Sequence, residues 1–160
     1  MTRATTATMI ALIATFSATA HASDDRLLQA VTERDTATVR QEVSLRAHVD
    51  VTDAHGNTAL MVASAYGYSD VVAILVDAGA DVNATGRIGN TALIVAVQGG
   101  HADVTRQLLA AEALVDVVND YGTNARDLAL GHGHRDIMAL LDGVPVEIDL
   151  GRSLLAYEAD

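Results

Sequence analysis

From about residue 24 onward, short apolar segments with helical spacing alternate with polar stretches that contain glycine. The segment after Thr58 is apolar at 60, 62 and 63, and the segment after Thr91 is apolar at 93, 95 and 96. This pattern predicts short amphipathic helices, each with a threonine as N-cap, because the hydroxyl can accept from free backbone amides. Gly67, Gly100 and Gly133 are predicted to end these first helices, since glycine adopts the left-handed conformation at little cost.

A second apolar stripe follows each of these glycines and predicts helices over about 69–77, 102–110 and 135–141. Polar residues that include Gly79 and Asn83 then lead to the next segment. The predicted unit is therefore a helix, a turn, a second helix and an extended loop, and the predicted fold class is all-α.

The units recur with a fixed period. The sequence GNTAL at 56–60 reappears at 89–93, and GTNA stands at 122–125, each 33 residues further on. Alanine recurs at 63, 96 and 129 in the same register. Such a period predicts a solenoid, in which a unit that cannot bury its own apolar face does so against its neighbours.

These residues resemble the ankyrin repeat, whose pattern runs D-x-x-G-x-T-P-L-H-x-A-A-x-x-G-H and continues through an apolar helix to L-L-x-x-G-A-D-V-N. The match is closest over DAHGNTAL at 53–60 and GADVNA at 79–84. The chain departs from the pattern at Gly86, where Asp is usual, at Asn124 and Arg126, and at 59, 92 and 125, where alanine replaces proline. The resemblance implies a solenoid of four helix-turn-helix units with hairpin-like loops.

We place the four repeats at about 24–52, 53–85, 86–118 and 119–142. The first is degenerate, with predicted helices over 27–31 and 36–43, as is common in terminal repeats that face water on one side. The tail over 143–160 alternates apolar and polar residues from Val144 to Leu150. It is expected to be extended and could cover the open end of the last repeat.

Residues 1–22 differ in composition from the rest of the chain. They contain no acidic residue and one cation, Arg3, ahead of an apolar run over 9–16 and small residues at 18, 20 and 22. This pattern predicts a signal peptide cleaved after Ala22, with Ala20 as the other possible site. The apolar stretch is shorter than the roughly 20 residues that cross a bilayer, so a retained anchor is less favoured, as is a cytosolic amphipathic helix. We expect a periplasmic or secreted protein that does not insert into the membrane after cleavage.

Charge and composition argue against several classes of function. The 160-residue chain contains ten arginines, no lysine and 21 acidic residues, which gives a net charge of −11. The net charge becomes −12 when Arg3 is removed with the signal peptide. A nucleic-acid partner is disfavoured, because phosphate binding needs clustered cations. The absence of cysteine excludes disulfides, thiolate chemistry and Cys-based metal sites.

Candidate chemistry is sparse. The chain has no G-x-x-x-x-G-K loop and no H-E-x-x-H motif, so we expect neither an enzyme nor a bound cofactor. His132 and His134 could suggest a metal pair, but no third ligand is identifiable beside them. His101 and His134 instead occupy the Gly-His position, where the resemblance implies a structural hydrogen bond between repeats. His55 lies at a predicted hairpin tip and is read as a solvent or partner contact.

The resemblance implies binding through the hairpin tips and the exposed positions of the first helices. Tyr66, Ile88 and Tyr121 are the strongest candidates, since large side chains stand where folding does not require them and tyrosine anchors interfaces well. The tip positions are Ala54, His55, Asn57, Arg87, Ile88, Asn90, Asp120, Tyr121 and Thr123, and the helix positions are Ala65, Tyr66, Gln98, Gly99, Gly131 and His132.

The expected partner is a protein, with a basic surface that the acidic charge would attract. The resemblance to exported bacterial ankyrin proteins implies an inhibitor or immunity-type partner of an exported enzyme, acting as a monomer or within a hetero-complex. It also leaves open an accessory role for a catalase or in haem handling, with His55, Tyr121 or His132 as haem contacts. A third alternative is a structural cap or oligomer scaffold.

Overall fold

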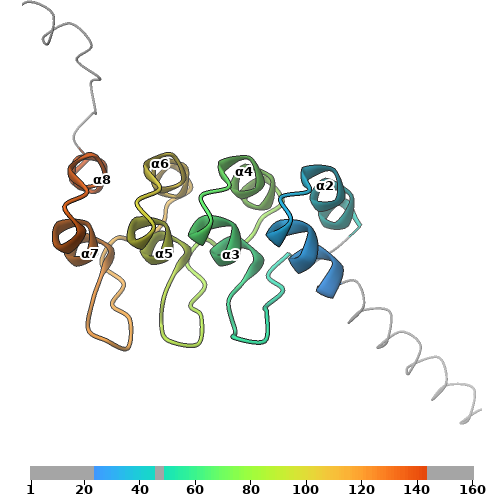
Figure 1. The fold of residues 1–160 in the computed structure, drawn as a ribbon, viewed down its shortest axis with the longest axis horizontal. Helices are drawn as coiled ribbons and strands as arrows, with labels where there is room; N and C mark the ends of the chain where they lie inside the picture. Colours follow the sequence, from blue (N-terminus) through green and yellow to red (C-terminus); the bar gives the residue numbers. More distant parts are fainter. Residues whose placement is uncertain (1–23, 46–48, 144–160) are drawn as a thin grey trace, which may run out of the picture.

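The computed structural model describes residues 24–45 and 49–143 (Figure 1). The predicted signal peptide over 1–22 and the tail beyond residue 143 lie outside the described residues. A helix over 24–32 comes first. The helices that follow are α2 (Thr36–Ser44), α3 (Ala59–Ala65), α4 (Ser69–Asp77), α5 (Ala92–Gln98), α6 (Ala102–Ala110), α7 (Ala125–His132) and α8 (Arg135–Leu141). The second helices predicted over 69–77, 102–110 and 135–141 are confirmed, and α2 ends one residue beyond the prediction.

The helices stack as antiparallel pairs in two rows (Figure 1). The first helices α3, α5 and α7 form one row, and α2, α4, α6 and α8 form the other, while the loops before α3, α5 and α7 project from one side as hairpins. Within the described residues the only strand-like pairing is a single bridge between Thr52 and Thr58. The all-α solenoid predicted from the sequence is confirmed.

The first helices begin at side-chain caps. The hydroxyl of Thr58 accepts from the Met61 amide at 3.2 Å, and Thr91 caps α5 in the same way. Asn124, which departs from the repeat pattern in the sequence, accepts from the Asp127 amide at 2.9 Å, while the Asp127 carboxylate accepts from the Asn124 amide at 3.3 Å. This reciprocal pair is a capping box, so the substitution for threonine preserves the start of α7.

Each first helix ends at a left-handed glycine, and those after α3 and α5 also make room for a histidine of the next repeat. Gly67 has φ +72°, and a Cβ added there would lie 2.5 Å from Nδ1 of His101. The same ring hydrogen-bonds through Nε2 to the carbonyl oxygen of Ala65 at 3.0 Å, which confirms the predicted structural role of His101. His134 lies against Gly100 in the corresponding place.

One continuous core runs through the stack, and equivalent positions of successive repeats contribute to it. Leu60 and Leu93 are almost completely buried at equivalent positions of α3 and α5, and Val71, Val104 and Ile137 are buried at equivalent positions of α4, α6 and α8. Burying each such aliphatic side chain contributes about 1.5–3 kcal/mol. The repeats therefore depend on one another for stability, and their first helices and hairpins are held at a constant spacing.

Candidate partner-binding surface

Three hairpins of the same construction project beside the first helices. In the first, the Asp53 amide donates to the Asn57 carbonyl at 2.9 Å, and the equivalent bonds close the hairpins at 86–90 (2.9 Å) and 119–123 (3.0 Å). In each tip a glycine with positive φ, such as Gly56 at +76°, reverses the chain. The residues at the tips are thus presented on a fixed backbone.

The carboxylate of Asp53 organises the first hairpin. Its Oδ1 accepts from the amides of His55 at 2.8 Å and Asn57 at 2.9 Å, and its Oδ2 accepts from the Asn57 side-chain amide at 3.1 Å. Partial burial alone raises the pKa of Asp53, but the hydrogen bonds from Asn57 and His55 outweigh it and hold this pKa below its ordinary value of 3.8. The hairpin therefore carries a negative charge at neutral pH.

The other hairpins reach the same shape with different residues. Asn119 accepts from the amides of Tyr121 and Thr123, both at 3.0 Å. Gly86 takes the equivalent place in the second hairpin, where an added Cβ would lie 3.2 Å from both Asn57 Oδ1 and Met61 Sδ. The second and third hairpins are also joined, since the Asp120 amide donates to the Ile88 carbonyl at 3.1 Å.

The structure divides the sequence-predicted tip residues into two groups. Half-buried Asn57, Asn90 and Thr123 make hydrogen bonds within or between hairpins: Asn57 with Asp53, Asn90 with the side chain of Asn119 at 2.8 Å, and Thr123 with Asn119. The others are exposed, with Tyr121 at 75% and Ile88 at 40%. The remaining exposed tip residues are Ala54, His55, Arg87 and Asp120, and the helix positions Ala65, Tyr66, Gln98, Gly99, Gly131 and His132 are exposed as well.

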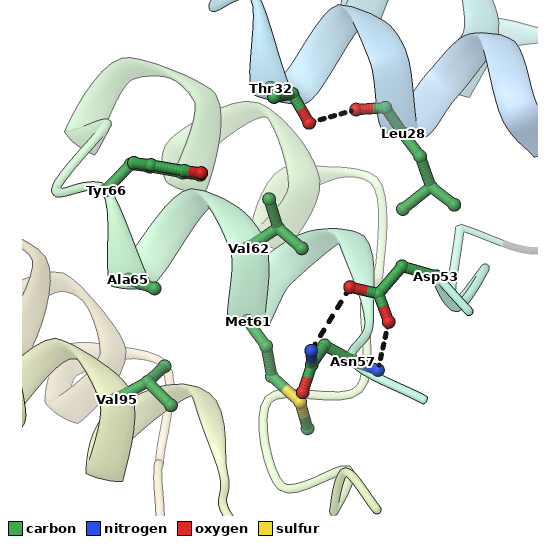
Figure 2. A pocket seen from close by; sticks show the side chains of 9 residues that line it. All are labelled: Leu28, Thr32, Asp53, Asn57, Met61, Val62, Ala65, Tyr66 and Val95. Carbon is green, nitrogen blue, oxygen red and sulfur yellow. Dashed lines mark hydrogen bonds between the residues drawn. The ribbon is translucent and has the colours of Figure 1, made fainter. Parts of the chain in front are cut away.

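A groove of about 310 Å³ lies where the helix over 24–32, α3, α5 and the first hairpin meet (Figure 2). Most of its lining is aliphatic or aromatic, and the polar groups of Asp53 and Asn57 stand at the hairpin side. The lining residues are Leu28, Thr32, Asp53, Asn57, Met61, Val62, Ala65, Tyr66 and Val95. Such an apolar groove with a charged group on its wall suits an apolar or amphipathic side chain of a partner.

Tyr66 is held in place at one wall of the groove (Figure 2). The residue is 56% exposed, and its ring stacks on that of Tyr68, with the centroids 5.4 Å apart and the planes 16° from parallel. The guanidinium of Arg34 lies 5.2 Å from the centroid of the Tyr68 ring and pairs with Asp70 at 3.2 Å. The exposed ring therefore loses little freedom when a partner binds, which favours Tyr66 as an interface anchor.

Sequence reasoning identified Tyr66, Ala65 and Asn57 but missed the groove between them. Val62 and Val95 are among the apolar positions from which the first helices are predicted, and the structure leaves both half-buried, lining the groove. The sequence signal that could have indicated this shared role is that Val62 and Val95 occupy equivalent positions, 33 residues apart. Spacing alone could not tell a core position from one that lines a groove between repeats.

The described residues offer little for other chemistry. The His132 and His134 rings stack with centroids 5.7 Å apart and planes 8° from parallel. Within 24–45 and 49–143, no three His, Cys, Asp or Glu side chains gather closely enough to hold a metal ion. None of the described helices has the length and apolar character needed to cross a bilayer.

Stacked helix pairs, projecting hairpins and a groove along the first helices define a helical-repeat binding module. The family model for ankyrin repeats in many copies matches residues 45–94 and 75–129, which together span just over half of the chain. The protein belongs to the ankyrin-repeat family. No match was found among curated proteins. Ankyrin repeats are protein–protein interaction modules, and this is the class of function that the fold supports.

Proposed function

We propose that this chain is exported and acts as an inhibitor or immunity-type partner of an exported enzyme, without catalytic activity of its own. It binds through the groove at α3 and the hairpin tips and covers the enzyme's substrate cleft. The observation that carries this proposal is the apolar groove walled by an exposed, stacked Tyr66.

Charge indicates the kind of partner surface. The described residues hold 17 acidic side chains and seven arginines. The depressed pKa of Asp53 keeps one of those charges on the groove wall itself. An acidic surface attracts a basic partner and speeds its capture, an effect that falls as salt is added. An enzyme whose substrate cleft has a basic rim would complement the acidic charge of this chain. An apolar side chain beside that cleft would insert into the apolar groove.

The accessory role in haem handling is the less favoured alternative. It would use His55, Tyr121 or His132, and none of these three side chains lines the groove described above. The His132 ring is instead stacked on His134. Titration of the chain with haemin, followed in the Soret band, is expected to give no shift. A saturable shift that His132→Ala abolishes would favour the haem role over the inhibitor role.

The interface test replaces the two exposed tyrosines in the chain from Ser23 onward. Tyr66→Ala with Tyr121→Ala should weaken capture of the partner from an extract of exported proteins by at least about 30-fold, since anchors of this type cost about 2 kcal/mol or more when truncated. Leu114→Ala is the matched control, because Leu114 is 59% exposed and lies outside the groove and the hairpin tips.

The melting temperature of the double variant should stay close to that of the parent, because both rings are largely exposed. Undiminished capture by the double variant would contradict the proposed surface. A captured enzyme that stays fully active in the complex would instead contradict the inhibitor role while leaving the surface intact.

Export is tested separately with a reporter enzyme that is active only outside the cytoplasm, fused after residue 30. Active reporter and a processed chain that begins at Ser23 are expected, because the apolar run and small residues fit a signal peptide. Leu12→Arg, which places a charge in the apolar run, should block export. Export of the Leu12→Arg fusion at the parent level would contradict the assignment.

A further inference from the structure

The last repeat exposes an apolar side chain at a position that is buried in the two repeats before it. Leu130 in α7 is 71% exposed, whereas its equivalents Ser64 in α3 and Val97 in α5 are completely buried. The difference follows from position in the stack, because α5 packs on α3 and α7 packs on α5, and α7 has no such neighbour on its outer side among the described residues.

Leu130 belongs to a shallow hollow of about 510 Å³ on the outer face of α7 and α8, here called the end face. Apolar groups make up most of it, while Arg135 and Asp142 bring the charged groups. Its lining residues are Ala129, Leu130, Gly133, Arg135, Met138, Ala139 and Asp142. The end face is thus an apolar surface at the very point where α8 ends at Leu141.

We propose that the segment over 144–150, which follows directly in the sequence, covers the end face. Val144, Val146, Ile148 and Leu150 alternate there with Pro145, Glu147 and Asp149. In an extended chain such alternation places the apolar side chains on one side and the carboxylates on the other. Seven extended residues reach about 23 Å, enough to cross a helix pair in which each helix is about 10 Å wide.

The attached segment is favoured over a second copy of the chain for two reasons. A segment tethered at residue 143 has an effective concentration in the millimolar range at the end face, far above that of a separate molecule. Two copies, each with a net charge of −11, also repel one another. The carboxylates of the segment face water in this arrangement, while its apolar side chains meet the apolar lining of the end face.

The absence of cysteine makes a direct test possible in the full chain. Leu130→Cys introduces a single thiol at the end face, and Tyr121→Cys introduces one at a hairpin tip whose parent residue is 75% exposed. If the segment covers the end face, the Leu130→Cys thiol should react with a maleimide at least about tenfold more slowly, because protection follows the equilibrium between covered and open states.

Adding Val146→Asp with Ile148→Asp to the Leu130→Cys chain should restore fast labelling, and the matched control Glu147→Gln with Asp149→Asn should not. Equal rates for the two single-cysteine chains would overturn the proposal without reference to the segment variants. Protection that disappears on dilution, with a doubled mass in light scattering, would also overturn it, because a second copy would then be the cover.

Discussion

At the scale of single residues, the first and third hairpins show one backbone shape held by two chemistries. Asp53 and Asn119 occupy equivalent positions, and each accepts two backbone amides through Oδ1. The geometry needs an acceptor and does not need a charge. The charge of Asp53 is therefore available to the groove, and it makes the stability of this hairpin dependent on pH.

Asp53→Asn should remove that pH dependence while keeping the turn. Because the folded pKa of Asp53 is depressed, its ionised form contributes stability above the ordinary value of 3.8, and this contribution is lost as the pH falls through the folded pKa. The free energy of unfolding in urea should therefore fall more steeply below about pH 4 in the parent than in the variant. Parallel pH profiles would contradict this. Asp53→Ala, which removes the acceptor, should be less stable than Asp53→Asn at every pH.

At the scale of elements, the ends of α3 and α5 are fitted to the repeat that follows. Gly67 combines a left-handed backbone with close contact to His101, whereas Gly133 has the same φ of about +73° and meets nothing within 4 Å at its Cβ position. A comparison of the same substitution at Gly67 and Gly133 therefore separates the cost of the left-handed backbone from the cost of crowding against a neighbouring side chain. The contact at Gly67 couples the turn after α3 to the start of α6.

Gly67→Ala should be clearly more destabilising than Gly133→Ala. Gly133→Ala, the control, should lower the free energy of unfolding by about 1–2 kcal/mol because of the left-handed conformation. At Gly67, crowding against the His101 ring should add about 1–3 kcal/mol to this loss. Urea unfolding of both variants measures the difference. Adding His101→Ala to each should narrow the gap between them, and equal costs for the two single variants would show that the ring moves aside freely.

The helices were predictable because their signals are local. Thr58 and Thr91 mark where α3 and α5 begin, and the fixed period transfers one well-marked unit onto its less regular neighbours. The groove was not predictable in the same way. Whether Val62 is fully or partly covered depends on how far apart neighbouring repeats stand at the groove, and the space around Gly86 is set by Asn57 and Met61 in a different repeat.

At the scale of the whole molecule, the stack is a row in which each helix pair contacts mainly its neighbours. The pairs α3–α4 and α5–α6 are covered on both sides by described residues, while the pair formed by 24–32 and α2 is covered on one. Stability in such a row is close to a sum of unit and interface contributions. The first pair should therefore open before the pairs in the middle of the stack.

Hydrogen exchange should follow this order. Amides in α3 to α6 are expected to exchange at least about tenfold more slowly than those in the first pair, because a missing interface lowers the local free energy of opening. Mass spectrometry of peptides from each pair would measure this. Uniform protection along the stack would mean that the chain unfolds as one cooperative unit and would contradict an additive row.

The helices start in strict register: α3, α5 and α7 begin at residues 59, 92 and 125, and α4, α6 and α8 begin at 69, 102 and 135. A gain or loss of one 33-residue stretch would therefore change the number of units without moving any helix boundary. In evolution or in the laboratory, the length of the row of first helices and hairpins can be adjusted in whole units, so that the reach of the protein across a partner is separable from the way each unit folds.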